Sequence, residues 1–402
     1  MAKLLLFCSV FMMTSLVHAD SLFAVNGFGQ WLHPVDERAR AMGGAALAVE
    51  GGFSALNPST AMVTERARIG VAMTPELLEV RTDTVAQDRA GFRLSIARGL
   101  FPVGDAGTLS LGLHPLGTFN APKMVSFVNA TDEIPGHFSS FESVGDLSAF
   151  GIGYAHAIGK VTLGFRTDAL FGSAVETWTM DFAADTVFVD ASERAVLIRD
   201  AIDHVETNVL GMQFSGGMTV RVSPRWTAGA YVVVRPWASG HEIVDGGSAG
   251  TEVNRTVEYD LPMQAGFGIA YHPTETFLAA VDFETALWSQ ARVDRQPRSE
   301  FVDSQRFGLG VEWYVGSEDS WLARNLPLRC GLSSTTGSYE TRALGRNDEQ
   351  RISFGSGIPL LRGRGQLDFS LSYALRTADS VREHDYLLGV NLTILETWSR
   401  SL

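Results

Sequence analysis

The sequence predicts an all-β protein: a transmembrane antiparallel β-barrel of 14 strands with an N-terminal plug inside its lumen. Three observations lead to this prediction. Fourteen segments alternate apolar with polar or small residues, the connections between them differ in length on a regular pattern, and a stretch rich in Gly, Ala and Ser precedes the first segment. A closed barrel can span a bilayer because it leaves no backbone hydrogen-bonding group unpaired in the lipid.

The first 19 residues predict export. Lys3 gives a positive start, residues 4–16 form an apolar run, and a small-residue cleavage signal ends at Ala19. A transmembrane anchor is the alternative, but the run is shorter than the ~20 apolar residues that a membrane-spanning helix needs. We therefore assign residues 1–19 to a signal peptide. Its removal leaves Cys330 as the one remaining cysteine, so we expect no intramolecular disulfide.

Residues 38–62 suit a plug better than a strand. They are rich in Gly, Ala and Ser, contain almost no bulky side chains, and end shortly after Asn57-Pro58. Gly and Pro weaken or interrupt a strand ladder, and a barrel of fourteen strands is too wide for side chains alone to fill. We expect residues 20–65 to plug the lumen near the periplasmic end and residues 66–402 to form the barrel.

The strand prediction rests on a period of two residues. Between Gln366 and Arg376 every second residue is apolar and those between are polar or small, which is typical of a strand with one apolar face. The same pattern recurs along the chain. The fourteen expected strands lie near residues 66–82, 89–101, 107–118, 145–157, 160–173, 205–222, 225–238, 253–272, 275–290, 300–315, 325–339, 347–359, 365–377 and 382–396.

The connections favour a membrane barrel over a soluble periplasmic sandwich, which would show the same alternation. Tight connections occur at residues 101–107, 158–160, 223–225 and 272–274. Long loops are expected at residues 119–144 and 174–204, the second with one helix opened by Ser192 and Glu193 and continuing through Val205. Short turns on one side, long loops on the other and an even strand number are the arrangement of bacterial outer-membrane barrels.

Aromatic residues near the strand ends predict two girdles at the membrane–water interfaces. The first set lies beside the tight connections and comprises Tyr154, Trp226, Tyr271 and Trp313. The second set lies near the opposite strand ends and comprises Trp237 and Trp288. Scattered core aromatics are the alternative interpretation.

Charge and motif content exclude several classes of function. The formal net charge is −13, which argues against nucleic-acid binding because that needs a basic surface. The sequence has no metal-ligand spacing, no phosphate-binding glycine motif and no nucleophile elbow. We therefore expect no enzyme, no cofactor and no metal. His204 beside Asp203 is the one candidate for chemistry at the rim, and a solvated loop histidine is the simpler interpretation.

The plug-like stretch resembles the hatch of the FadL/TodX family of outer-membrane transporters for long-chain fatty acids and other hydrophobic molecules. That family has a Gly/Ala-rich run after an Arg, then acidic and small residues, then Asn-Pro-Ala. Here Ser59 replaces the Ala, and the acidic pair is reduced to Glu50. The matching residues are Arg40, Gly43, Gly44, Ala45, Glu50, Asn57 and Pro58.

The resemblance implies passive uptake of hydrophobic small molecules across the bacterial outer membrane. Cargo would be captured near the extracellular loops, transferred to a pocket beside the hatch, and released through the barrel wall into the bilayer. The implied partners are a hydrophobic ligand of fatty-acid type, outer-membrane lipid, and the barrel-assembly machinery during insertion.

A second function remains open at this point. The related PorV-like accessory barrels of type IX secretion bind partner proteins, and their Arg-Ala-Met-Gly-Gly-type run is matched by Arg40–Gly44. An apolar pocket beside the hatch would favour transport. A lumen filled by charged pairs up to the rim would favour partner binding.

Polar residues on the expected inward faces are candidates for the lumen lining. Most should form structural ion pairs, whereas a carboxylate ligand would need an unpaired Arg beside an apolar pocket. The candidates are Arg93, Arg166, Asp168, Gln264, Glu312 and Arg376, with Gln213, Arg221, Asp282, Glu284 and Asp368 beside them. Pro75 and Pro115 interrupt the first and third segments. Because Pro is confined to edges or bulges of a ladder, each marks either a kink that opens the wall, as in the kinked early strand near the family's lateral opening, or a strand end.

Overall fold

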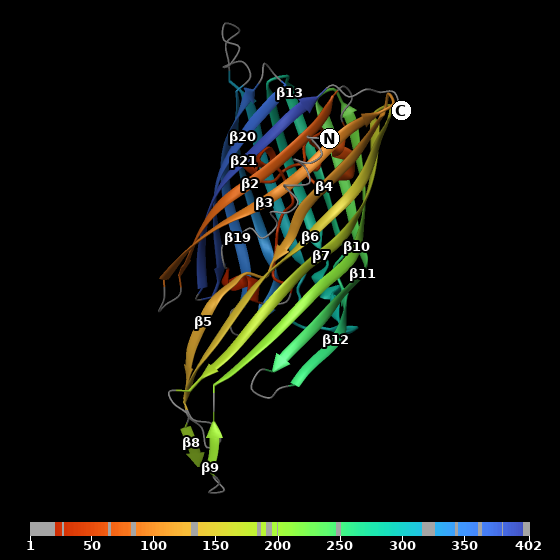
Figure 1. Ribbon diagram of the computed structural model, residues 1–402. Coiled ribbons are helices and arrows are strands. Elements are labelled where there is room, and N and C mark those ends of the chain that lie inside the picture. The colour runs from red at the N-terminus through yellow and green to blue at the C-terminus, as the bar shows by residue number, and fades with distance from the viewer. Residues whose placement is uncertain are drawn as a thin grey trace.

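Fourteen antiparallel strands close into a barrel in the computed structural model of the chain (Figure 1). Each strand pairs with the next one in the ring, and the ring closes where β2 pairs with β21. The predicted 14-strand barrel is confirmed. The structure describes residues 21–25, 28–62, 66–81, 86–129, 136–182, 186–189, 195–198, 200–246, 251–315, 326–341, 345–360, 364–379 and 381–396. The predicted signal peptide lies outside them.

The barrel strands correspond one to one with the fourteen segments expected from the alternation pattern. They are β2 (Ala67–Arg81), β3 (Ala86–Val103), β4 (Gly107–Thr118), β6 (His137–Ile158), β7 (Val161–Asp181), β10 (Ala201–Ser223), β11 (Trp226–Gly246), β13 (Gln264–Thr274), β14 (Phe277–Ala286), β17 (Ser304–Tyr314), β18 (Pro327–Thr341), β19 (Gly345–Leu360), β20 (Gly365–Ala378) and β21 (Val381–Glu396).

The four predicted tight turns lie at one end of the barrel, which we call the turn end. They join β3 to β4, β6 to β7, β10 to β11 and β13 to β14, at or next to the predicted positions. The opposite end, the loop end, is less uniform than expected. Only 4, 3 and 2 residues separate β2 from β3, β18 from β19 and β20 from β21 there.

Two expected long loops are largely strand, and this prediction was wrong. β6 and β7 run past the predicted strand ends and pair with each other out to Phe138 and Asp181. The helix predicted over Ser192–Val205 was also wrong where the structure describes it, because β9 (Ala195–Ile198) and the start of β10 occupy that region. β9 pairs with β8 (Thr186–Val189), and β10 with β7. β-branched Ile, Val and Thr favour such pairing over a helix.

Two wall positions are each filled by two strands in succession. β5 (Ala121–Val128) continues β4 along β6, and β12 (Thr251–Asp260) precedes β13 along β11. β12 also pairs with β15 (Arg292–Val293), which pairs with β16 (Gln296–Pro297). The wall ladder is therefore interrupted at residues 119–120 and 261–263, both toward the loop end (Figure 1).

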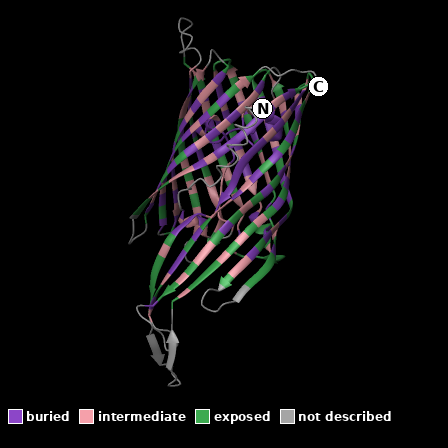
Figure 2. Ribbon diagram, in the orientation of Figure 1, coloured by how far each residue is buried: buried purple, intermediate pink, exposed green. Residues whose placement is uncertain are grey.

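The outward face of the barrel is apolar. Large hydrophobic side chains are exposed at every second position of most strands, as on β21, where Tyr386, Leu388, Leu392 and Ile394 are 39–50% exposed. Figure 2 shows the resulting alternation of buried and exposed residues around the ring. Such a surface suits the hydrocarbon core of a bilayer. No helix in the described part of the chain is long and apolar enough to cross a membrane.

The aromatic girdle was predicted correctly at most positions and wrongly at one. Tyr154, Trp226, Trp313 and Trp237 are 45–52% exposed on the outer surface. Trp288 is only 3% exposed, because it belongs to η3 (Trp288–Gln290), which follows β14 instead of extending it. The chain turns inward there, and the indole packs among other rings inside the loop end.

Residues 28–62, which we call the N-terminal segment, lie inside the ring of strands. They contain β1 (Gln30–Trp31), α2 (Glu37–Ala41) and η2 (Pro58–Ala61), and η1 (Leu22–Val25) precedes them. α2 contacts β18 to β21, whereas η2 contacts β6, β7 and β10 on the opposite side of the ring. In Figure 1 the segment is drawn in red within the barrel.

Candidate functional site

Asp36 organises the start of the N-terminal segment. One carboxylate oxygen accepts a hydrogen bond from the backbone N–H of Ala39 (2.9 Å), so Asp36 caps α2. The other accepts from the backbone N–H of Phe53 (2.9 Å). A single buried carboxylate therefore links the start of α2 to the backbone of Phe53, near the other end of the segment.

The loop after α2 packs against the wall at van der Waals distance. Gly43 and Gly44 adopt φ of +64° and +77°, a region that favours Gly because it has no Cβ. A Cβ on Gly43 would lie 2.3 Å from the carbonyl oxygen of Leu332. Further along, Asp282 of β14 accepts hydrogen bonds from the backbone N–H groups of Ala46 (2.6 Å) and Leu47 (2.8 Å). Asp282 thus ties the backbone of this loop to the wall.

Asn57-Pro58 fixes the C-terminal part of the N-terminal segment in place. The Asn57 amide donates to the carbonyl of Leu47 (2.7 Å), and its oxygen accepts from the backbone N–H of Ser59 (3.1 Å). The Ser59 hydroxyl lies 2.5 Å from that of Thr219 on β10. Ser59, which replaces the Ala of the resembled motif, therefore adds a hydrogen bond to the wall.

Buried ion pairs also connect the segment to the wall. Arg38 binds Glu312 (2.7 Å), which also binds Arg329 (2.6 Å), and Arg329 reaches Asp368 (2.7 Å). Within the segment, Glu37 pairs with Arg40 (3.1 Å), and it also accepts a hydrogen bond from the Thr74 hydroxyl on β2 (3.1 Å). Breaking such a pair is costly because the remaining charge stays buried without a partner.

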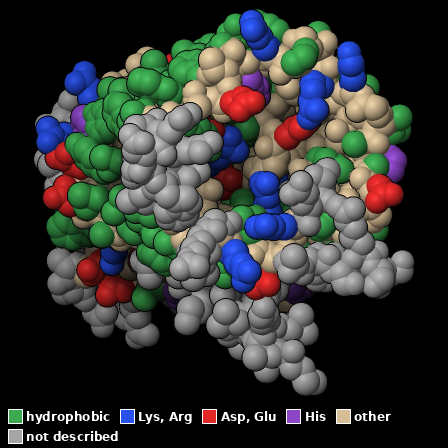
Figure 3. All heavy atoms as spheres, turned by 90° about the horizontal axis from the view of Figure 1, so that it is seen from above, with side chains coloured by type: hydrophobic (Ala, Val, Ile, Leu, Met, Phe, Trp, Pro, Cys, Tyr) green, Lys and Arg blue, Asp and Glu red, His purple; other side chains and the backbone are tan. Residues whose placement is uncertain are grey.

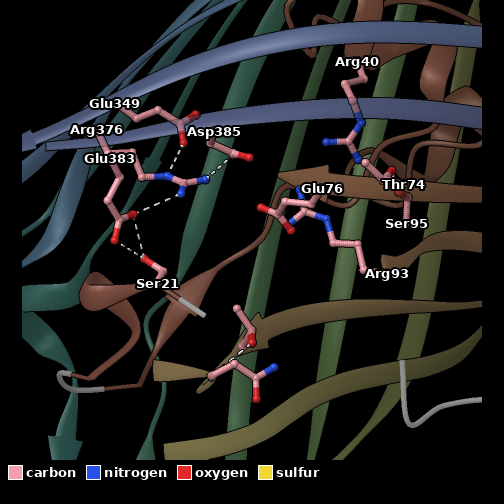
Figure 4. A network of polar contacts seen from close by, with 12 residues as sticks. Ser21, Arg40, Thr74, Glu76, Arg93, Ser95, Glu349, Arg376, Glu383 and Asp385 are labelled. Carbon is pink, nitrogen blue, oxygen red and sulfur yellow. Dashed lines mark hydrogen bonds and ion pairs between the residues drawn. The ribbon is translucent and has the colours of Figure 1, made fainter. Parts of the chain in front are cut away.

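Four of the predicted lining residues form charged pairs on the wall. Arg166 and Asp168 bind each other on β7 and are 1% exposed. Arg93 of β3 lies 3.4 Å from Glu76 of β2. Arg376 lies at the centre of a larger group, which Figure 4 shows together with Ser21: its guanidinium binds Glu349, Glu383 and Asp385 at 2.9, 3.3 and 2.6 Å.

The remaining candidates lie elsewhere. Gln264 is half-buried at the start of β13 and Glu312 belongs to the ion-pair chain with Arg38. Arg221 is exposed and binds Glu50 (3.0 Å) at the turn end. In the view from the turn end, basic and acidic side chains surround a hollow near the centre of the face (Figure 3).

A cavity of about 230 Å³ lies between the N-terminal segment and the wall. Its apolar lining includes Trp31, Leu56, Leu116, Val233 and Trp288. Its polar lining includes His33, His114, Gln213, Gln264, Glu284, Glu349 and six arginines: Arg40, Arg93, Arg235, Arg306, Arg351 and Arg376. The cavity is therefore amphipathic, with aromatic rings and guanidinium groups on the same walls.

An aromatic cluster lies beside this cavity toward the loop end. It comprises Phe28 and Trp31 of the N-terminal segment with Tyr259, Trp288, Phe301 and Tyr339. The Trp31 and Trp288 ring centroids are 5.1 Å apart in an edge-to-face arrangement, which is favourable for aromatic pairs. Trp31, Trp288 and Tyr339 also line the cavity, so the cluster forms part of its wall.

His33 connects the segment to the cavity. Its Nε2 lies 2.9 Å from Glu284, which also binds Arg306 (2.9 Å). Burial lowers the pKa of His33, and the neighbouring Arg306 acts in the same direction against the opposing effect of Glu284. A neutral His33 therefore binds Glu284 through a hydrogen bond, while Arg306 supplies the counter-charge.

The wall changes its pairing beside the cavity. β3 pairs with β4 only over residues 97–103 and 107–113. In the described part of the chain, residues 86–96 of β3 pair with β2 alone. The free edge of β4 is instead taken by β1, with Gln30 opposite Thr118 and Trp31 opposite Gly117.

Both predicted wall prolines lie inside strands. Pro115 of β4 lies at a register shift in the pairing with β6 and lines the cavity. Pro75 of β2 pairs with Phe92 of β3, but the ladder to β21 skips Thr74 and Pro75.

Sequence reasoning missed Arg235, Trp31 and His33. Arg235 follows Tyr231 and Val233 at every second position of β11, and all three are buried. This alternation places Arg235 on the inward face, so the pattern contained a usable signal. Trp31 and His33 precede the small-residue stretch, and no local pattern distinguishes them from a linker.

Comparison with known proteins supports the fold. Sequence comparison finds no matching family model and no matching curated protein. The Pseudomonas putida toluene transporter TodX is similar, with a TM-score of 0.59, 14% identity, and coverage of 92% of this chain and 99% of TodX. The CymD monoaromatic hydrocarbon channel gives a TM-score of 0.60, 15% identity, and coverage of 91% and 98%.

A third solved structure agrees with these two. A Pseudomonas aeruginosa FadL homologue gives a TM-score of 0.62 at 12% identity, with coverage of 91% of this chain and 99% of the homologue. Coverage of nearly the whole length of all three proteins shows that the likeness includes the entire barrel. The chain therefore has the fold of FadL-type outer-membrane barrels.

Proposed function

We propose that the chain is an outer-membrane channel for the passive uptake of hydrophobic small molecules, long-chain fatty acids among them, and that residues 20–65 act as its hatch. The observation that carries this proposal is an amphipathic cavity against the N-terminal segment, beside a wall position where strand pairing is missing. Such a cavity can hold a ligand between the loop end and the wall.

The exit route we propose runs through the wall between β3 and β4. Over residues 86–96 of β3, the described chain provides no ladder to β4, and β1 occupies the free edge of β4 instead. β1 is held by short backbone pairing, including a bond from the Leu32 N–H to the Leu116 carbonyl (2.8 Å). Withdrawing β1 would break few hydrogen bonds and connect the cavity with the bilayer.

Pro115 and Pro75 contribute to this route by weakening the ladder. A proline has no N–H to donate, so it cannot contribute a ladder hydrogen bond from its own nitrogen. Pro115 lies on the strand that borders the missing pairing, and Pro75 lies one strand away. In this proposal the two prolines lie where the strands of the wall separate to release the cargo.

A lateral exit suits an apolar cargo. A hydrophobic molecule gains free energy on moving from water into lipid, at about 25 cal/mol per Å² of apolar surface buried. A water-filled pore would return it to water on the periplasmic side. The named functions of two solved neighbours, a toluene transporter and a monoaromatic hydrocarbon channel, support a hydrophobic cargo here.

The alternative function, a barrel that binds partner proteins, is not favoured. Charged pairs fill much of the lumen around the N-terminal segment, as that alternative predicted. They do not fill the cavity, whose lining includes two Trp side chains. An amphipathic cavity inside the lumen can bind a small ligand, whereas a partner protein would bind at the rim of the barrel.

Uptake by cells tests the proposal. The full chain is expressed in a bacterial host that lacks channels of this kind, and entry of radiolabelled hexadecanoate and toluene is measured against the empty host. We expect faster entry of at least one probe when the barrel is present in the outer membrane. Entry equal to that of the empty host for both probes would contradict the proposal, provided that a folded barrel is recovered from the outer membrane.

A further inference from the structure

We propose that the cavity takes a small aromatic monocarboxylate and that Arg235 is the counter-ion for its carboxylate. This inference rests on the proposed channel function, for which it names a ligand class. It differs from a channel for neutral hydrocarbons, because a hydrocarbon carries no anionic group that could pair with a buried guanidinium.

Arg235 lies on the inward face of β11, next to an irregularity in the strand. The pairing of β10 with β11 shifts register between Met212/Phe214 and Trp237/Val234, so Arg235 and Pro236 lie at a β-bulge. Bulges redirect side chains and are frequent beside functional sites. Arg235 is 8% exposed and lines the cavity.

The hydrogen bonds of Arg235 all go to neutral oxygens. Its guanidinium donates to the Pro262 carbonyl (2.7 Å) and to the amide oxygens of Gln213 (3.1 Å) and Gln264 (3.5 Å). Among the described residues these are its three acceptors. A guanidinium has five N–H donors, so two remain available to a ligand.

The other arginines of the cavity are paired. Each has a carboxylate oxygen within 3.4 Å: Arg40 with Glu37, Arg93 with Glu76, Arg306 with Glu284, Arg351 with Glu349, and Arg376 with Asp385. Arg235 forms no such pair within the described residues. A buried charge without a partner is unfavourable. An anion that enters the cavity therefore gains the most binding free energy when it pairs with Arg235.

The carboxylate that Arg235 could otherwise use is already occupied. Asp168 binds Arg166 (2.6 Å) and accepts a hydrogen bond from the Gln213 amide (3.0 Å). Gln213 in turn accepts from Arg235. The amide therefore lies between Arg235 and Asp168, so that Arg235 has no direct contact with this carboxylate.

The shape and lining of the cavity favour a single aromatic ring. Trp31 lies with its ring 5.0 Å from the Arg235 guanidinium carbon, and Trp288 packs against Trp31. A cavity of about 150 Å³ is known to bind benzene. The 230 Å³ available here accommodates such a ring together with a carboxylate.

Arg235 also has a structural role that the test must separate from binding. By donating to Pro262 it satisfies a carbonyl at the interruption between β12 and β13. Loss of that bond would affect folding, but it would not distinguish a charged ligand from a neutral one of the same shape. The informative measurement is therefore the ratio of the affinity for a charged ligand to the affinity for a neutral ligand of the same shape.

The experiment compares benzoate with benzamide, which have the same ring and nearly the same shape but differ in charge. Binding to the purified full chain in detergent is measured by titration calorimetry for the wild type, Arg235→Gln, Arg235→Lys and the control Arg255→Gln. Arg255 lies outside the cavity lining, with its side chain 59% exposed against Glu242. We expect wild type and control to bind benzoate about 10- to 100-fold more tightly than benzamide, the range for hydrogen bonds to charged groups.

The variants decide between the outcomes. We expect Arg235→Gln to lose the preference for benzoate, and Arg235→Lys, which keeps the charge, to retain part of it. Equal binding of both probes by the wild type, or an unchanged preference in Arg235→Gln, would overturn the inference and leave the channel proposal intact. If Arg235→Gln does not fold, the wild-type ratio and Arg235→Lys still decide. Absence of both binding and cellular uptake of hydrophobic probes would remove the channel proposal as well.

Discussion

The two halves of the lumen differ in how their polar groups are used. Toward the turn end, the N-terminal segment meets the wall through Asp282, Asn57 and the chain of ion pairs from Arg38 to Asp368. Toward the loop end, a cavity remains, Arg235 has no carboxylate partner within the described residues, and β1 alone pairs with the free edge of β4. In the turn-end half, the polar groups of the segment are paired with the wall. In the loop-end half, Arg235 has donors that could bind a ligand.

The difference explains why small residues are concentrated in the segment. Gly164 and Gly217 face Asn57-Pro58, and a Cβ on Gly217 would lie 2.0 Å from the Asn57 amide oxygen. Close backbone approach on both sides allows a short segment to fill a wide barrel. Two aromatic side chains of the segment, Phe28 and Trp31, join the aromatic cluster toward the loop end.

Deleting residues 36–61 should have the largest effect on the closed half. The wall ladder does not depend on these residues, so the barrel should still form, but its lumen would fill with water. We expect a steady ion current in planar bilayers where the full chain gives none. A deletion variant that folds and stays non-conducting would show that other residues close the pore.

Glu312→Gln should give the next largest effect. Glu312 neutralises both Arg38 and Arg329, and Arg329 is fully buried. Leaving Arg38 without its carboxylate, and Arg329 with Asp368 alone, should lower the free energy of unfolding by about 3–5 kcal/mol, measured by urea denaturation in detergent. The matched control is Glu258→Gln, which with Arg295 forms a pair exposed on both sides, and which should cost less than about 1 kcal/mol. Equal losses in the two variants would indicate that the ion-pair chain is no more important than a surface pair.

Asn57→Ala should have a smaller and more local effect. It removes the bond to the Leu47 carbonyl and the cap on η2, at a cost of about 1–3 kcal/mol for a carbonyl left buried without a donor. We expect faster hydrogen exchange at Ser59 and Thr60, with exchange in α2 unchanged. Slow hydrogen exchange at η2 in this variant would mean that packing alone holds η2 in place.

The sequence predicted the barrel well because its signal is local. Alternation such as that of Gln366–Arg376 reports a strand directly, and all fourteen barrel strands follow from it. Predictions failed where tertiary contacts override local pattern. Within the predicted helix, residues 195–198 and 201–205 are strand because their neighbours offer ladder partners. Trp288 turns inward because β14 ends before it.

The candidate site was predicted less completely. Inward polarity identified Arg166, Glu312 and Arg376, but their partners lie up to 274 positions away along the chain, as for Glu312 and Arg38. No local pattern could show which arginine lacks a carboxylate. That property of Arg235 depends on the register of β10 and β11 and on the interruption between β12 and β13.

The most direct test of the central claim locks β1 to β4. Cysteines replace Gln30 and Thr118, which lie opposite each other, in a Cys330→Ser background because Cys330 is free and exposed. The control places cysteines at Glu142 and Thr177, which face each other where the β6–β7 ladder is continuous. Uptake of hexadecanoate and toluene is measured before and after reduction.

If β1 gates the wall, oxidation of the Gln30→Cys/Thr118→Cys variant should lower uptake to the level of cells without the protein, and reduction should restore it. The control cross-link should leave uptake unchanged. Undiminished uptake through a fully formed β1–β4 cross-link would contradict a wall exit at this position.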